Sequence, residues 1–392
     1  SHPPGTIAPV KILHTSDWHV GRTIRGRDRA HEHRAVLSEI AGVARAEAVE
    51  LVVVAGDLFD SAAPTAEAER IVYRSLLDLA EVGPVVVVAG NHDHPRRLQA
   101  VAPLLELGRV TVGSHLRIPE EGGVVRVATD GGEAARVALV PFLSQRYIVS
   151  ADDLMHLDAD DHGGAYEERM RLILERLCAA MGPEEVNLVV GHLTAAGART
   201  GGGERQAHIF GYTVSPASFP GSLHYAALGH LHRCQQVPAN CPAWYSGSPL
   251  QLDFGEVEDR KGVLVVEAAP GHPAEVREVP LTCGRRLRTL RGTLEEVAAL
   301  SDITDDAYLK VVLDEPGRVG LADRVRELFP QAVDVVLAAP PDPDRAEASP
   351  VRLGRPPREL FDEYLRHGRA HDDRLIELFD RLLEEAHAPD QA

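Results

Sequence analysis

The stretch VVVVAGNHDH, residues 85–94, is the part of the sequence that most constrains the fold. Four valines and an alanine precede a glycine and then four polar residues, Asn91, His92, Asp93 and His94. A short apolar run that is rich in β-branched residues and closed by glycine is typical of a strand buried on both faces. The polar residues would then follow the carboxyl end of this strand, which is where parallel α/β folds bind their ligands.

The same arrangement, an apolar run followed by Asp or His, occurs at four other places in the chain. The runs at residues 10–13, 51–55, 188–190 and 226–228 are followed, in turn, by Asp17 and His19, Asp57 and Asp60, His192, and His230 and His232. Segments at 29–48, 66–80 and 166–181 have apolar residues at helical spacing. This alternation predicts an α/β fold with parallel strands, and further runs at 137–140, 243–245 and 263–267 extend it to a layered domain that ends near Pro280.

The residues after the strands include donors of the kinds that bind metal ions. The donor set is Asp17, His19, Asp57, Asn91, His192, His230 and His232. Carboxylate and imidazole donors suit Mn, Fe, Zn or Mg rather than soft copper sites. Asp17 and His19 lie two residues apart, as do His230 and His232, so in extended backbone both side chains of each pair point the same way. The set is too large for one ion and suits two ions that share a carboxylate.

A pair of ions would define the chemistry of the site. Two ions roughly 3.5–4 Å apart can clamp a phosphate oxygen and lower the pKa of a bridging water. His92 stands between two of the polar residues, Asn91 and Asp93, and could give a proton to a leaving oxygen. The sequence therefore predicts hydrolysis of a phosphate ester.

Length, charge and cysteine content limit the remaining possibilities. The chain has 392 residues, which is enough for one large domain and one or two small ones. Its net charge of -18 disfavours an unaided nucleic-acid binder, so metal ions, local arginines or a basic partner would have to supply positive charge. The four cysteines form no C-x-x-C pair, which argues against structural zinc and fits reduced thiols in the cytoplasm. The sequence also predicts no signal peptide and no membrane association, since no apolar run approaches about 18 residues.

The C-terminal third has a different organisation. Residues 281–340 predict three strands and two helices in a small α+β unit, and residues 341–357 form a proline-rich linker. Residues 358–390 predict two short amphipathic helices. Their apolar faces carry Phe361, Tyr364 and Leu365 on the first helix and Ile376, Phe379 and Leu383 on the second. Packing on their own domain is one explanation, but helices detached by a linker favour docking on a partner.

The complete set of motifs resembles the signature of the calcineurin-like metallophosphoesterases. The longer strings resemble the bacterial members of the Mre/Rad-type DNA-repair nucleases. These strings are LHTSDWHVG from Leu13, VVVAGDLFD from Val52, VVVVAGNHDHPRRL from Val85, ALGHLH from Ala227 and YSGSPLQLDFGE from Tyr245. The resemblance covers residues 10–280 strongly and residues 281–392 weakly. It implies an α/β/β/α sandwich at 10–280, a DNA-recognising capping domain at 281–340, and a helical segment at 358–390 that docks on a coiled coil.

The resemblance also implies roles for individual residues. One ion would be held by Asp17, His19, Asp57 and His232, and the other by Asp57, Asn91, His192 and His230. The usual ion of the family is Mn²⁺, with Mg²⁺ also possible. His92 would act on the transition state and the leaving group, and Asp93 would orient His92 or a nearby ligand. Asp60 stands where archaeal and eukaryotic relatives carry histidine, so no histidine role is transferred to it.

The implied function is a DNA nuclease that acts as an exonuclease on duplex ends and as an endonuclease on single strands and hairpins. The resemblance implies a nucleoid-associated homodimer within a heterotetramer with an SbcC-like SMC-type ATPase. ATP hydrolysis would belong to that partner, because this chain has no Walker motif. Alternatives are a phosphomonoesterase or cyclic-nucleotide phosphodiesterase of the same fold, and a non-catalytic DNA-end scaffold. Residues 281–392 argue against the phosphatase, and the complete donor set argues against the scaffold.

Two groups of arginines follow the motifs and are candidates for DNA contact. Arg22, Arg25 and Arg27 come after the first motif, and Arg96 and Arg97 come after the third. A solvated charged surface explains them equally well. The glycines at 201–203 lack the Lys-Ser/Thr of a phosphate-binding P-loop, so this segment is expected to be a mobile loop.

Overall fold

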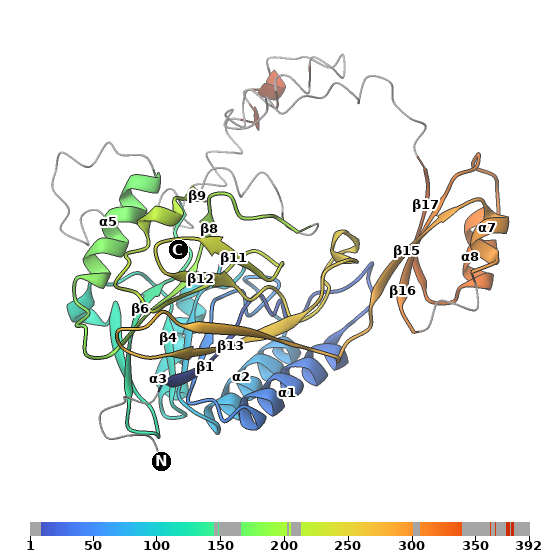
Figure 1. The fold of residues 1–392 in the computed structure, drawn as a ribbon. Coiled ribbons are helices and arrows are strands. Elements are labelled where there is room, and N and C mark those ends of the chain that lie inside the picture. The colour runs from blue at the N-terminus through green and yellow to red at the C-terminus, as the bar shows by residue number, and fades with distance from the viewer. Residues whose placement is uncertain are drawn as a thin grey trace. The chain divides into compact units, whose positions relative to one another are not determined.

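The computed structural model describes residues 9–144, 148, 166–201, 204, 213–300, 306–338, 361, 365, 374–376 and 378–379. By its internal contacts the chain divides into one unit over residues 1–338 and a second over residues 339–392. The first unit contains a large layered domain and a small domain (Figure 1).

Two six-stranded sheets form the centre of the large domain. The first has the order β14-β13-β1-β2-β3-β4 and the second the order β11-β12-β10-β7-β6-β5. The strands of the first sheet are β1 (Val10–Thr15), β2 (Leu51–Val54), β3 (Val85–Val88), β4 (Val110–Gly113), β13 (Gly262–Ala268) and β14 (Glu275–Pro280). Those of the second are β5 (Val124–Ala128), β6 (Ala134–Val140), β7 (Val186–His192), β10 (Tyr225–Gly229), β11 (Gln235–Pro238) and β12 (Pro242–Tyr245).

Most neighbouring strands run parallel, as the alternation of strands and helices predicts. In the first sheet β1, β2, β3 and β4 are parallel, whereas β13 is antiparallel to both β1 and β14. In the second sheet β6, β7, β10 and β12 are parallel, whereas β5 and β11 are antiparallel edge strands. The carboxyl ends of β1, β2 and β3 and of β7 and β10 therefore carry the sequence motifs.

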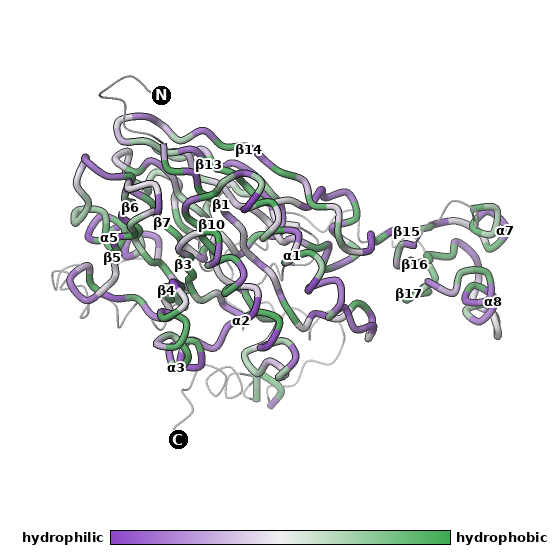
Figure 2. Tube along the Cα trace, turned by 90° about the horizontal axis from the view of Figure 1, so that it is seen from below, coloured by the Kyte–Doolittle hydropathy of each residue, from purple (hydrophilic) through white to green (hydrophobic). Residues whose placement is uncertain are grey.

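Helices cover the outer faces of the two sheets. Helices α1 (Ala30–Ala46), α2 (Ala66–Ala80) and α3 (Pro95–Glu106) pack against the first sheet, and α5 (Tyr166–Cys178) packs against the second. Along β1, Ile12 faces the second sheet while Leu13 faces the helices, and both are completely buried. Figure 2 shows hydrophobic residues along the inner strands and mixed colours along the helices. The predicted α/β/β/α sandwich is confirmed.

The remaining elements of the large domain are short. A two-stranded ladder joins β8 (Thr194–Ala195) to β9 (Thr213–Val214). Among the described residues, 3₁₀ turns span Pro119–Glu121, Pro216–Ser218 and Phe254–Glu256. No helix in the described part of the chain has the length and apolar character needed to cross a bilayer.

The small domain alternates strands and helices around its own core. Its elements are β15 (Leu287–Gly292), α7 (Leu294–Ala298), β16 (Tyr308–Leu313), α8 (Leu321–Leu328) and β17 (Ala332–Leu337). Thr293 and Glu296 form a capping box that starts α7. The expected three strands and two helices are present, but all three strands run parallel. The domain is therefore a βαβαβ unit rather than the expected α+β arrangement. Each connection passes through a helix and returns the chain to the end of the sheet where the previous strand began.

The second unit is described only at a few residues of its helices. The rings of Phe361 and Phe379 stack with centroids 4.3 Å apart and planes 13° apart. Leu365 is buried and Ile376 is half-buried, while Leu375 and Leu378 are about two-fifths exposed, at 39% and 40%. The two predicted apolar faces thus contact each other through one aromatic pair. Tyr364, Leu383 and the predicted linker lie outside the described residues.

Candidate metal centre

The predicted donors meet where the carboxyl ends of strands from both sheets come together. Asp17 and His19 follow β1, Asp57 follows β2 and Asn91 follows β3. His192 is the last residue of β7, and His230 and His232 follow β10. Asp17, Asp57 and all four histidines are buried, whereas Asn91 is exposed.

The donor atoms form two groups that join at Asp57. One carboxylate oxygen of Asp57, Oδ2, lies 3.5 Å from His19 Nε2 and 3.4 Å from His192 Nε2. The first group brings together ligand atoms of Asp17, His19 and His232, and the second brings together those of Asp57, His192 and His230.

Asn91 completes the second group. Its Oδ1 lies 2.9 Å from His192 Nε2 and 2.8 Å from His230 Nδ1. The structure thus brings all seven predicted donors together, four around each of two positions, with Asp57 common to both.

The backbone at the donors is strained rather than extended. Asp17, His19, Asp57 and His230 have φ angles of 52°, 46°, 52° and 103°. Residues other than glycine rarely adopt this left-handed backbone conformation, and those that do are concentrated at functional sites. The expectation that extended backbone aligns Asp17 with His19 is therefore wrong. Their positions come instead from hydrogen bonds of Asp17 N to Gly56 O and of His19 N to Asp57 O, each 3.0 Å long.

Two glycines leave the space that the donors occupy. Gly56 has a φ of +88°, and a Cβ there would collide with the ring of His192. A Cβ on Gly90 would collide with the carboxylate and the backbone nitrogen of Asp57. Glycine is therefore required at both positions by close approach, and at Gly56 also by the backbone angle.

The charges in the centre depend strongly on one another. Burial lowers the pKa of His192, but the adjacent Asp57 carboxylate more than offsets burial and raises that pKa to about 9. Burial raises the pKa of Asp57, but the charges of His192 and His19 outweigh burial and hold that pKa well below its usual range. Burial also raises the pKa of Asp17. The buried carboxylate of Asp57 is thus stabilised by positive charge beside it, which a bound cation would also supply.

The donor set fits two divalent cations. Carboxylate, amide and imidazole donors in this proportion are those of dimetal hydrolases. Buried polar atoms normally have hydrogen-bond partners, yet His230 Nε2 is buried without one. His232 Nε2 and His19 Nε2 lie 3.2 Å apart. The lone pairs of these two nitrogens would repel each other unless a proton or a cation lay between or beside them. The residues therefore fit a divalent ion in each group.

His92 lies next to the first group. Its Nδ1 lies 2.9 Å from the carbonyl oxygen of Asp60, and its ring packs edge to face on His19 with centroids 4.7 Å apart. A carbonyl only accepts hydrogen bonds, so His92 Nδ1 carries the proton and Nε2 is left available. A ligand atom of His92 also lies within 4.8 Å of those of His19 and Asp57.

Asp93 contacts the backbone beside two of the donors, Asp57 and Asn91, rather than the ring of His92. Its carboxylate accepts hydrogen bonds from the backbone nitrogens of Gly90 at 2.8 Å, Phe59 at 3.1 Å and Leu58 at 3.3 Å. Burial and the charge of Asp57 raise its pKa to about 6. Asp93 therefore joins the loops after β2 and β3, while the ring of His92 is oriented by the Asp60 carbonyl.

Sequence reasoning missed the residues that support His232. The carboxylate oxygen Glu256 Oε1 lies 2.8 Å from His232 Nδ1, and Glu204 Oε1 accepts a 2.6 Å hydrogen bond from His232 N. Burial raises the pKa of Glu256, but the hydrogen bond with His232 and the charge of Lys261 outweigh burial and lower it to about 2. Glu256 closes the string YSGSPLQLDFGE, which was the available signal, but a contact across 24 residues leaves no periodic pattern.

The five candidate arginines fall into two classes. Arg22 pairs with Asp60 at 3.3 Å, Arg25 with Asp334 at 2.8 Å and Arg97 with Glu69 at 2.6 Å. Arg27 and Arg96 are exposed, and neither forms an ion pair with any residue that the structure describes. Of the five candidates, only Arg27 and Arg96 could therefore bind a ligand without breaking an ion pair within the described chain.

The sheets and the paired donor groups define a metal-dependent phosphoesterase. The profile described as calcineurin-like phosphoesterase matches residues 10–234, and the chain belongs to this family.

Nuclease relatives place the chain more narrowly. It is 31% identical to the SbcD component of the SbcCD nuclease of Bacillus subtilis (strain 168), over 94% of this chain and 97% of the relative. It is 33% identical to the component of the same name from Rhodobacter capsulatus, over 85% of each chain. Identity to the Escherichia coli (strain K12) component is 30%, over 74% of this chain and 73% of the relative. Within the phosphoesterases, the chain is a member of the SbcD family of nuclease subunits.

Proposed function

We propose that this chain is the catalytic subunit of an SbcCD-type nuclease and hydrolyses phosphodiester bonds of DNA at duplex ends, single strands and hairpins. The observation that carries the proposal is the shared position of Asp57 between two donor groups, with His92 beside them. Membership of the SbcD family supports DNA as the substrate and an SbcC-type ATPase as the partner.

The residues of the centre have two roles in the proposed hydrolysis, metal binding and proton donation. Asp17, His19, Asp57 and His232 would hold one ion, and Asp57, Asn91, His192 and His230 the other. When bound, such a pair would supply Lewis-acid stabilisation of the phosphate and would lower the pKa of the attacking water. The Asp60 carbonyl fixes the tautomer of His92, so Nε2 is left available for the substrate. In its protonated form, His92 would give the Nε2 proton to the departing sugar oxygen.

We propose Mn²⁺ as the working ion. Four of the seven donors are imidazoles. Imidazole donors suit transition metals, whereas Mg²⁺ prefers oxygen donors and retains several waters. Mg²⁺ is therefore expected to bind more weakly.

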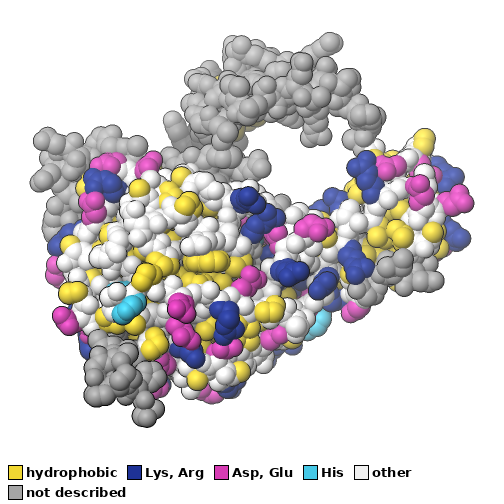
Figure 3. Space-filling view, in the orientation of Figure 1, with side chains coloured by type: hydrophobic (Ala, Val, Ile, Leu, Met, Phe, Trp, Pro, Cys, Tyr) yellow, Lys and Arg dark blue, Asp and Glu magenta, His cyan; other side chains and the backbone are white. Residues whose placement is uncertain are grey.

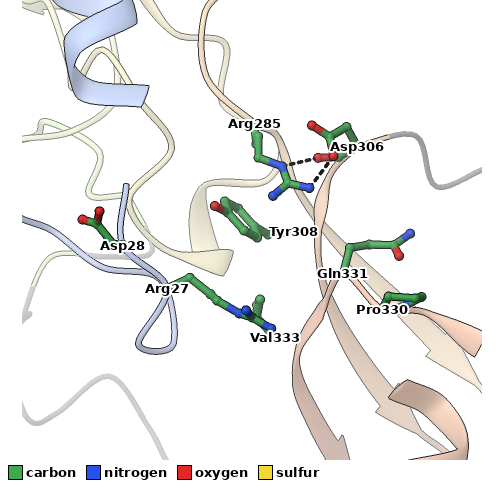
Figure 4. Close-up of a pocket in the computed structure, with 8 residues that line it drawn as sticks. All are labelled: Arg27, Asp28, Arg285, Asp306, Tyr308, Pro330, Gln331 and Val333. Carbon is green, nitrogen blue, oxygen red and sulfur yellow. Dashed lines mark hydrogen bonds and ion pairs between the residues drawn. The ribbon is translucent and has the colours of Figure 1, made fainter. Parts of the chain in front are cut away.

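A cavity between the large and small domains supports a path for DNA. It has a volume of about 610 Å³ and is lined by Arg27, Asp28, Arg285, Asp306, Tyr308, Pro330, Gln331 and Val333. Arg27 enters from the loop after β1, whereas Tyr308 and Val333 belong to the strands of the small domain (Figure 4). Arg285 stacks over the ring of Tyr308, 4.4 Å from its centroid, and pairs with Asp306. Arg27 is thus the free cation of this cavity among the described residues.

Substituting Arg27 tests this path. Arg27→Ala is expected to weaken duplex binding and to reduce the slope of log affinity against log salt by about 0.9, the value for one phosphate contact. Fluorescence anisotropy at several salt concentrations measures this slope. Arg277→Ala, which removes an arginine paired with Glu47, is the matched control. An unchanged slope in Arg27→Ala would show that Arg27 does not contact DNA.

The charge of the surface supports a basic partner. On the face shown in Figure 3, Lys and Arg side chains are scattered among Asp and Glu rather than gathered in one patch. With a net charge of -18, the chain has little long-range attraction for DNA. We propose that the ATPase partner supplies this attraction and docks on the tail helices, where Leu375 and Leu378 are exposed.

The assembly state is also a proposal. Leu104 and Leu107, at the end of α3, are 69% and 85% exposed, which is unusual for large apolar side chains. We propose that such surface is covered in a homodimer, which would join two ATPase subunits in a nucleoid-associated heterotetramer.

One set of substrates separates the proposed nuclease from its alternatives. The purified chain with Mn²⁺ is expected to cleave a labelled hairpin DNA and a nitrophenyl phosphodiester, with faster hairpin cleavage when the ATPase partner is added. Hydrolysis of the nitrophenyl monoester alone would indicate a phosphatase. DNA binding without hydrolysis of any substrate would indicate a scaffold.

A further inference from the structure

The two donor groups differ in what supports their histidines. In the second group, His192 Nδ1 lies 2.8 Å from the backbone carbonyl of Ala55, whereas His230 Nδ1 lies 2.8 Å from Asn91 Oδ1, which is itself one of the donors. In the first group, His232 Nδ1 lies 2.8 Å from the carboxylate of Glu256. A carboxylate makes the opposite ring nitrogen a stronger donor to a metal ion than a neutral carbonyl does.

Both carboxylate oxygens of Glu256 have hydrogen-bond partners. Its side chain is completely buried, and Oε2 accepts hydrogen bonds from Lys261 Nζ at 2.8 Å and from Leu252 N at 3.1 Å. Burying an isolated carboxylate is costly. A buried Glu256 that is paired with Lys261 and contacts a donor histidine therefore indicates a specific role.

Lys261 holds the same histidine from its backbone side. Its ammonium group donates to His232 O at 3.0 Å and to Ser248 Oγ at 2.8 Å. The backbone nitrogen of Ser248 also donates to His232 O, at 3.1 Å. The segment from Ser248 to Lys261 thus fixes both the ring and the backbone of His232.

We propose that Glu256 is a positioning residue that sets the affinity of the first ion, the one held by Asp17, His19, Asp57 and His232. By accepting the Nδ1 proton of His232, Glu256 keeps the lone pair on Nε2, the atom that faces His19 Nε2 at 3.2 Å. The second ion has no such carboxylate behind its histidines among the described residues. This inference rests on the proposed two-metal function.

Calorimetric titration of Mn²⁺ into the metal-free full chain tests the inference. The wild type is expected to bind two ions. In Glu256→Gln one of the two binding steps should weaken by about 10–100-fold, and the other should remain unchanged, since supporting carboxylates contribute that much to metal affinity. Glu258→Gln is the matched control, because it removes the same charge at an exposed position two residues away.

The possible results separate this inference from the proposed function. Two unchanged steps, or two steps weakened equally, would show that Glu256 only stabilises the fold. A wild type that binds fewer than two ions would contradict the two-metal function and this inference with it. Should Glu256→Gln not fold, Glu256→Asp keeps the charge beside Lys261. Because its side chain is one methylene shorter and cannot reach both partners, it should also weaken one step selectively.

Discussion

Replacing Asp57 with asparagine is expected to reduce bound Mn²⁺ from two ions to one or none and to slow DNA cleavage by about 10³-fold or more, since a metal ion contributes several kcal/mol to catalysis. Asp57 uses both oxygens, because Oδ1 accepts the backbone N–H of His92 at 2.8 Å while Oδ2 faces His19 and His192. An asparagine amide has one oxygen and one NH₂ group. Whichever way it turns, it places a donor against the His92 N–H or against the ions.

Metal analysis together with hairpin cleavage measures both effects. The matched control is Asp130→Asn, because Asp130 lies on the surface and pairs with Arg109 at 2.8 Å. This control should bind two ions and cleave at the wild-type rate. If Asp57→Asn retained two ions with wild-type affinity, Asp57 would not be shared and the proposed centre would be wrong.

The position of the centre could be predicted because local patterns determine it. Apolar runs such as residues 85–88 identify buried strands, and polar residues that follow parallel strands collect at one edge. This reasoning selected all seven donors, and the structure brings them together. The parallel direction of the central strands was predicted from the same alternation.

Elements with weaker local signals were not predicted. Helix α3 begins at Pro95 directly after the third motif and contains Pro103, which obscures its helical pattern. Strand β14 has mostly exposed and half-buried side chains, since it lies at the edge of its sheet. Helix α3 therefore lacks a clear helical pattern, and strand β14 lacks the continuous apolar run that identifies a buried strand.

Contacts across long sequence separations were also beyond prediction. The pairing of Arg25 with Asp334 spans 309 residues and depends on how the small domain meets the loop after β1. The left-handed backbone of Asp17 and His19 results from hydrogen bonds to the loop after β2. Both features depend on tertiary structure, so residue types and spacing alone could not indicate them.

Replacing His92 with glutamine is expected to slow hairpin cleavage by about 10²–10⁴-fold, the usual contribution of a general acid. The same change should have a much smaller effect on a nitrophenyl phosphodiester, because nitrophenolate departs without needing a proton. His92 Nδ1 is committed to the Asp60 carbonyl, so the proposed proton leaves from Nε2. Glutamine can keep a hydrogen bond to that carbonyl but cannot give up a proton.

The number of bound ions distinguishes this role from metal binding. A ligand atom of His92 lies within 4.8 Å of those of His19 and Asp57, so His92 could instead be a ligand. A general acid predicts that His92→Gln binds two ions and loses rate mainly on DNA, while the exposed control His272→Gln behaves as wild type. Loss of an ion, with equal loss of rate on both substrates, would assign His92 to the metal shell. The discrimination works because leaving-group protonation matters only where the departing oxygen is strongly basic, as the sugar oxygen of DNA is.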